Sequence, residues 1–103
     1  MRIYLSGPIT GVKDYRRNFR EAAASIQSRG HTVFNPADGF GPMSLREIMR
    51  WDLLCLTDCD GIYMMDGWSG SGGAKIEHDL AIYLGMEIYY NLDQIPDNTE
   101  PET

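Results

Sequence analysis

Two carboxylates of the sequence stand where acid–base or nucleophilic chemistry could use them. Glu77 falls in the first turn or so of a predicted helix, directly after the glycine-rich loop 66–73. Asp52 falls inside the apolar stripe of another predicted helix, three residues after Met49 and four after Ile48. Burial disfavours an ionised carboxylate and raises its pKa, which suits a proton donor near neutral pH. Glu77 and Asp52 are therefore the first candidates for catalysis.

Each candidate also has an explanation without chemistry. A glutamate in the first turn of a helix often only complements the helix dipole. Asp52 could be hydrogen-bonded to Arg50 or to a loop amide. Tyr4, on one face of the first predicted strand, could donate a hydrogen bond to a carboxylate or could be a core tyrosine. The residues themselves leave these alternatives open.

Short apolar runs alternate with helical periodicity along the chain. Strands are predicted at residues 2–6, 31–34, 60–65 and 87–90, and helices at about 14–29, 44–57 and 74–84. Ser44 and Glu47 form a capping box for the second helix, and Gly30 and Gly85 are expected to end the first and the third. This order without hairpin dipeptides predicts a single-domain Rossmann-like (flavodoxin-like) α/β fold, with about four to five parallel strands and helices on both faces.

Ligands of an open parallel sheet bind beyond the carboxyl ends of its strands. Three loops are expected to meet there, at residues 6–11, 35–42 and 66–73. A glycine-rich loop that opens into a helix exposes backbone N–H groups and a positive dipole end, which suits phosphate or carboxylate, although glycine is equally typical of turns. Asp66 could contact a ribose or cap its loop, and Trp68 could stack on a flat ring or shield the loop.

The net charge of −6 is concentrated at the C-terminus. Residues 93–103 hold four acids and no base, so eleven acids and nine bases remain elsewhere, a net charge of −2. Long nucleic acid is therefore not an expected partner, because it requires a basic footprint. Lys13 and Arg16, on the exposed side of the first helix, could still reach a phosphate.

No apolar run approaches the roughly 18 residues of a membrane span, and no signal peptide is recognisable, so we expect a cytoplasmic protein without a membrane partner. Cys55 and Cys59 lack further ligands at metal-binding spacing and are expected to be buried thiols. We expect residues 1–91 to form the domain and the polar, acidic segment 92–103 to be a flexible tail.

Three motifs follow one another along the chain: Ile3-Tyr-Leu-Ser-Gly-Pro8, Asp52 ahead of Cys59-Asp60, and the helix 72–85 that carries Glu77. Together they resemble the nucleoside 2-deoxyribosyltransferase superfamily, which includes the 2′-deoxynucleoside 5′-monophosphate N-glycosidases. The likeness spans residues 2–90 and is greatest to short members found in phages and bacteria. Ile3-Tyr-Leu-Ser-Gly-Pro8 is similar to the family's first strand, whose tyrosine assists the catalytic glutamate. Residues 72–85 match its Gly-x-x-x-Glu-x-x-x-Ala nucleophile helix, and Asp52 stands eight residues before Asp60, as the family's aspartate does. The resemblance implies Glu77 as nucleophile, Asp52 as proton donor and Tyr4 as the residue that orients Glu77.

One position departs from the members that act on free nucleosides. Those enzymes carry an aspartate six residues before the nucleophile, where this chain has Ser71. The chain resembles the monophosphate-cleaving branch there, since a serine can donate to phosphate whereas an aspartate repels it. The implied 5′-phosphate pocket consists of Ser6, Gly7, Thr10, Gly11, Ser71 and Gly73. Asn91 is the candidate for the residue that the family often takes from near the C-terminus of a neighbouring subunit.

The implied activity is cleavage of the N-glycosidic bond of a (2′-deoxy)nucleoside 5′-monophosphate, by hydrolysis or base transfer, through a covalent glycosyl–Glu77 intermediate. The resemblance implies a small nucleoside or nucleotide partner, neither metal nor organic cofactor, and a homodimer or larger assembly. Two alternatives remain open, because fold alone does not determine function. The chain could bind a nucleotide without turning it over, as a sensor or sponge, or it could have a structural role.

Overall fold

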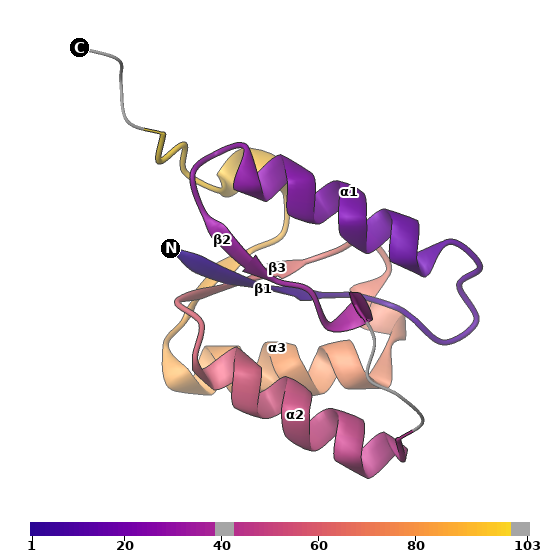
Figure 1. Cartoon of the computed structure of the whole chain (residues 1–103). Coiled ribbons are helices and arrows are strands. Elements are labelled where there is room, and N and C mark those ends of the chain that lie inside the picture. The colour runs from indigo at the N-terminus through magenta and orange to yellow at the C-terminus, as the bar shows by residue number, and fades with distance from the viewer. Residues whose placement is uncertain (39–42, 100–103) are drawn as a thin grey trace.

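The computed structural model describes residues 1–38 and 43–99, which form a parallel sheet covered by helices on both faces. The strands are β1 (Arg2–Ser6), β2 (Thr32–Phe34), β3 (Gly61–Met64) and β4 (Glu87–Tyr89), and the helices are α1 (Tyr15–Gln27), α2 (Leu45–Thr57) and α3 (Gly72–Leu84). Helix α1 lies on one face of the sheet, and α2 and α3 lie on the other (Figure 1). The predicted α/β class and the four-stranded parallel sheet are confirmed.

The strand order β2-β1-β3-β4 creates a crevice at one edge of the sheet. All three pairings are parallel, and β1 lies between β2 and β3. The chain moves from β1 to β2 on one side and then crosses to β3 on the other, so the loops that follow β1 and β3 diverge. Ligands of doubly wound folds bind at this switch point. Part of the loop expected at residues 35–42 lies outside the described residues.

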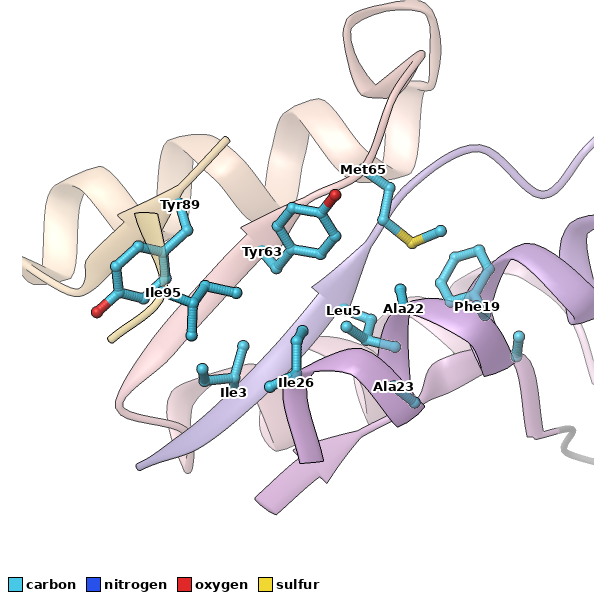
Figure 2. Packing of buried hydrophobic residues seen from close by; sticks show 11 residues of the cluster. Ile3, Leu5, Phe19, Ala22, Ala23, Ile26, Tyr63, Met65, Tyr89 and Ile95 are labelled. Atoms are coloured by element: carbon cyan, nitrogen blue, oxygen red, sulfur yellow. The ribbon is translucent and has the colours of Figure 1, made fainter. Parts of the chain in front are cut away.

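Alternation along β1 separates an apolar face from a polar one. Ile3 and Leu5 point toward α1 and pack with Phe19 and Ile26, as Figure 2 shows. Each such side chain contributes about 1.5–3 kcal/mol when fully buried. Tyr4, on the opposite face, belongs to the cluster beneath α2 and α3. Two-residue periodicity therefore directs every second side chain of β1 toward the helices that follow β2 and β3.

Helix boundaries agree with the capping signals, with two differences. Ser44 accepts a hydrogen bond from the Glu47 amide at 3.2 Å, as predicted, and Gly85 ends α3 with φ +70°. Helix α3 begins at Gly72, two residues earlier than predicted, because Ser71 caps it through the Ala74 amide. Glu77 therefore lies in the second turn of α3, with the free N-terminal amides one turn before it.

Helix α1 ends earlier than the glycine signal suggests. Its last residue is Gln27 and its C-cap is Ser28, whereas Gly30 occupies the following turn with φ +87°. A Cβ at Gly30 would lie 2.7 Å from the Asn98 carbonyl oxygen. Glycine is therefore required here by both its positive φ and the close approach of the C-terminal segment.

The segment expected to be a flexible tail packs against the domain in its first part. Ile95 is 2% exposed and joins the cluster beneath α1 (Figure 2). The Arg29 guanidinium donates to the carbonyls of Leu92 and Ile95, and the Asn98 amide donates to the Arg29 carbonyl at 2.7 Å. The packed unit thus extends past residue 91, since Leu92 and Ile95 contact the core and hydrogen bonds to Arg29 anchor the segment. No helix in residues 1–38 or 43–99 has the length and apolar character needed to cross a membrane.

Candidate active site

Glu77 lies at the centre of a buried hydrogen-bonded group. Its side chain is 5% exposed and both of its carboxyl oxygens accept hydrogen bonds from β1. The Tyr4 hydroxyl donates to Oε2 at 2.5 Å, and the Ser6 hydroxyl donates to Oε1 at 2.7 Å. Tyr4 and Ser6 are two residues apart on the strand, so both hydroxyls point to the same face of the sheet.

Small residues on α3 bring Glu77 close to the strand. The buried positions of this helix are Ala74, Glu77 and Ala81, which lie on one face at helical spacing. Because alanine fills little space, the helix can approach the sheet closely, and the glutamate then reaches β1. The predicted contact between Tyr4 and a carboxylate is present in the structure.

Asp52 is a second buried carboxyl, on α2. It is 7% exposed, and its Oδ1 has no hydrogen-bond partner within the described part of the chain. Hydrogen bonds to Arg50 or to a loop amide, the alternatives left open by the sequence, are not seen for this atom. A buried polar atom without a partner is unfavourable unless a ligand completes it.

The environment raises the pKa of both carboxyls. Burial raises the pKa of Asp52 to about 6. Burial also raises the pKa of Glu77 to about 7, although the hydrogen bonds from Tyr4 and Ser6 act in the opposite direction and the charge of Asp52 adds to the increase. The pKa of Tyr4 is held well above its ordinary value, first by burial and then by the Glu77 charge, so its hydroxyl remains a donor.

Hydrogen bonding distinguishes the two carboxyls chemically. Two hydroxyl donors favour the ionised form of Glu77, whereas Asp52 has no donor that would favour its carboxylate. Between about pH 6 and 7 the pair holds roughly one proton, and the two groups titrate together. Because the pKa of Asp52 is the lower of the two, this proton lies mainly on Glu77, and the form that a nucleophile and an acid require, with an anionic Glu77 and a protonated Asp52, is the minor one of the singly protonated pair.

Both carboxyls line a cavity of about 280 Å³ at the carboxyl end of β1. This volume is close to the lower end of the range of small-molecule sites, about 300 Å³. The predicted phosphate-pocket residues on its wall are Gly7, Thr10, Ser71 and Gly73. Arg16 also lines the cavity, whereas Lys13 is not among its lining residues.

The N-terminus of α3 opens onto this cavity. Ser71 accepts from the Ala74 amide at 3.3 Å, which leaves its own hydroxyl proton available to donate. The first amides of a helix have no partner within the helix and carry partial positive charge. This end of the cavity is therefore suited to an anion, and Arg16, which also lines the cavity, adds a positive charge to its wall.

Five of the predicted site residues do not line this cavity. Asp66 lines a separate cavity, which Asn18 and Ser25 of α1 also line. Trp68 packs on His78 with ring centroids 4.4 Å apart and does not line the cavity. Asn91 caps the short 3₁₀ turn Leu92–Gln94. Gly11, with φ +78°, is exposed and does not line the cavity.

Ser6 is the fifth residue. It was expected among the phosphate ligands, but it is buried and its hydroxyl proton is directed to Glu77. The spacing Tyr4-x-Ser6 is the signal that could have revealed this, since residues two apart on a strand share a face. Apolar lining residues such as Leu45 and Met49 were not recognised either, because their spacing equally suits a helix core.

Cys55 and Cys59 are free thiols, and Cys59 is buried while Cys55 is half-buried. Burial raises the pKa of Cys59 to about 11, so this thiol stays protonated at neutral pH. Within residues 1–38 and 43–99, no group of three or more His, Cys, Asp or Glu side chains is placed to hold a metal ion.

Fold and cavity together define a doubly wound α/β protein with a pair of buried carboxyls at the switch point of its sheet. The chain belongs to the family described as a domain of unknown function, DUF4406, whose model matches residues 1–90. No curated protein matches the chain significantly.

The structure is similar to that of a 2-desoxiribosyltransferase from Leishmania mexicana, with a TM-score of 0.69 and 18% sequence identity. The match covers 84% of this chain and 61% of the transferase, so the chain spans about three fifths of that protein's length. At this identity the likeness establishes the fold alone.

Proposed function

We propose that this protein cleaves the N-glycosidic bond of a (2′-deoxy)nucleoside 5′-monophosphate through a covalent glycosyl–Glu77 intermediate. The observation that carries the proposal is the pair of buried carboxyls on one cavity wall, of which Glu77 has both oxygens held by hydroxyl donors and Asp52 has an oxygen without a partner. The similarity in fold to a 2-desoxiribosyltransferase supports glycosyl transfer as the class of reaction.

In the proposed reaction, a Glu77 oxygen attacks C1′ while the bond from C1′ to the base nitrogen breaks. The bonding electrons leave with the base, and Asp52 transfers its proton to the base. Water then attacks C1′ of the ester, its proton returns to the Asp52 carboxylate, and the C1′–Oε bond breaks. A second base in place of water would make the enzyme a transferase.

The 5′-phosphate is proposed to lie at the N-terminus of α3. The free amides of this helix, the Ser71 hydroxyl and the Arg16 guanidinium would supply the donors and positive charge for it. An aspartate at position 71 would place a negative charge beside the phosphate instead.

Chromatographic detection of free base tests this proposal. Incubating the protein with each common deoxynucleoside monophosphate, ribonucleoside monophosphate and deoxynucleoside is expected to release base from at least one monophosphate. Stoichiometric binding of a nucleotide without base release would instead establish the alternative, a nucleotide-binding module. The absence of both binding and release would favour a structural role.

Ser71→Asp is expected to change the choice of substrate. The ratio of kcat/KM for monophosphate over nucleoside should fall by about tenfold or more, since a like charge at close range costs at least about 1.4 kcal/mol. Ser69→Asp is the matched control, because it introduces the same charge at an exposed position of the same loop. An unchanged ratio in Ser71→Asp would contradict a phosphate at the N-terminus of α3.

We also propose that the protein works in the cytoplasm as a homodimer joined through the outer surfaces of α2 and α3. Large apolar side chains are about half exposed or more on this surface: Leu54, Ile76, Ile82, Tyr83 and Leu84. Exposed apolar side chains that gather on one face are typical of an interaction surface. Arg50 lies four residues before Leu54 on α2, and Asp58, the C-cap of α2 and the ion-pair partner of Arg2, lies four residues after it. Antiparallel packing of two α2 helices about a two-fold axis at Leu54 therefore brings opposite charges together.

Leu54→Arg is expected to convert the dimer to a monomer, as measured by light scattering after size exclusion. The side chain is 59% exposed, so the substitution should leave the fold intact. Gln27→Arg, an exposed position on α1, is the control and should remain dimeric. A wild-type protein that is monomeric at the concentration of the activity assay would overturn the dimer.

A further inference from the structure

Ser6 is a buried polar residue that the proposed reaction does not use directly. It is the last residue of β1, is 1% exposed and does not line the cavity. Its hydroxyl donates to Glu77 Oε1, across 71 residues of sequence, while Tyr4 donates to Oε2 from the same face of the strand. The two donors approach Glu77 from β1, beneath α3, whereas Glu77 itself forms part of the cavity wall.

We propose that Ser6 is a positioning residue that, together with Tyr4, clamps the Glu77 carboxyl with one hydroxyl on each oxygen so that its remaining lone pairs face the cavity. This inference rests on the proposed function, since it assigns a nucleophilic role to Glu77. Each carboxylate oxygen has two lone pairs, so one hydrogen bond per oxygen leaves an acceptor site free for attack.

Two hydroxyls restrict the carboxyl more than one does. A single donor on Oε2 leaves the group free to rotate about its final torsion, which is broad for glutamate. A second donor on Oε1 removes this rotation and keeps the attacking oxygen in place. Positioning of reacting groups contributes substantially to catalysis because it lowers the entropic part of the activation free energy. The Ser6 bond also favours the ionised carboxyl, which is the nucleophilic form.

The Ser6 hydroxyl has one proton, and that proton is directed to Glu77. Ser6 therefore cannot at the same time donate to a phosphate. This separates it from Ser71, which lines the cavity and whose hydroxyl proton is available. Loss of the two hydroxyls is accordingly expected to have different effects.

The titration of Glu77 provides a test that needs no turnover. The carbon-13 signal of the Glu77 carboxyl is followed against pH by NMR in an Asp52→Asn background, in which only one carboxyl of the pair titrates. Adding Ser6→Ala should move the midpoint upward by about one pH unit, because a hydrogen bond to a charged group is worth roughly 1.5 kcal/mol or more. Adding Ser71→Ala should leave it unchanged. An unchanged midpoint in folded Ser6→Ala protein would overturn the clamp.

Kinetics give a second, independent readout. With Asp52 intact, Ser6→Ala should lower kcat by about tenfold for both monophosphate and nucleoside substrates while KM stays within about twofold. A change confined to the KM of monophosphates would instead assign Ser6 to phosphate binding and contradict the inference. If Ser6→Ala does not fold, Ser6→Cys keeps the volume with a weaker donor and should also raise the midpoint. A wild-type protein without activity would refute the proposed function, whereas the NMR titration would still decide the clamp.

Discussion

Glu77→Gln is expected to reduce base release by roughly 10³-fold or more, because loss of a nucleophile removes the covalent route altogether. A neutral amide does not attack C1′, yet it has nearly the same shape as the carboxyl. The fold should persist, because the amide oxygen can still accept from one β1 hydroxyl and the amide nitrogen can donate to the other. The substitution also removes a carboxyl whose charge is disfavoured by burial, so the variant should be at least as stable as the wild type above pH 7.

Chromatographic base release and thermal unfolding, measured side by side, check this result. Mass spectrometry adds a direct readout, since wild type quenched during turnover should carry the deoxyribosyl phosphate on the peptide that contains Glu77. Glu87→Gln makes the same chemical change at an exposed position and should retain wild-type activity. Wild-type rates in Glu77→Gln, or an adduct on another residue, would refute the covalent role of Glu77.

Asp52→Asn is expected to lower activity by roughly 10²–10⁴-fold, the contribution typical of a general acid. The wild type should show a bell-shaped dependence on pH with a maximum near pH 6.5, since activity requires the form of the pair that retains one proton. In the asparagine variant the descending limb should disappear, and only the rise due to ionisation of Glu77 should remain. An undiminished rate with the descending limb intact would exclude Asp52 as the proton donor.

The same substitution should stabilise the protein at alkaline pH. The pKa of Asp52 is about 6 in the folded state and near its ordinary value of 3.8 in the unfolded chain. Between these values the folded state binds more protons, so wild-type stability falls as pH rises from about 4 to about 6 and stays lower above that. The asparagine variant lacks this loss.

The gain in melting temperature should therefore be largest above about pH 7 and vanish toward pH 4. A gain of about 1 kcal/mol corresponds to roughly 4–8 °C for a domain of this size. Calorimetry at pH 4, 6 and 8 measures it, with the exposed Asp79→Asn as the control. A gain that is equal at all three pH values would contradict the raised pKa of Asp52.

Asp52→Asn is thus expected to lower activity and to raise stability, which is the combination expected of a residue that is kept for function. A buried carboxyl whose Oδ1 lacks a partner destabilises the fold, and a structural role gives no reason to keep it. Glu77 differs in this respect, because Tyr4 and Ser6 satisfy both of its oxygens.

Local patterns in the sequence are sufficient to predict the elements of this fold and two of its central residues. Strand runs and helical stripes depend on neighbouring residues, so the order of strands and helices could be derived from them. Asp52 could be recognised because a charged residue within an apolar stripe is conspicuous wherever the helix packs. Glu77 could be recognised because it follows a glycine-rich loop at the edge where parallel sheets bind ligands.

Only the tertiary structure decided which side chains meet at the cavity. Asp66 and Ser71 belong to the same loop, yet they line two different cavities. The bond between Ser6 and Glu77 joins residues 71 positions apart, and the distance between them depends on strand order and on how closely α3 approaches β1. Ile95 is anchored in the same way, by contacts with a distant part of the chain. Periodicity reports which face of an element is buried, whereas contacts between elements depend on how those faces are oriented and packed in three dimensions.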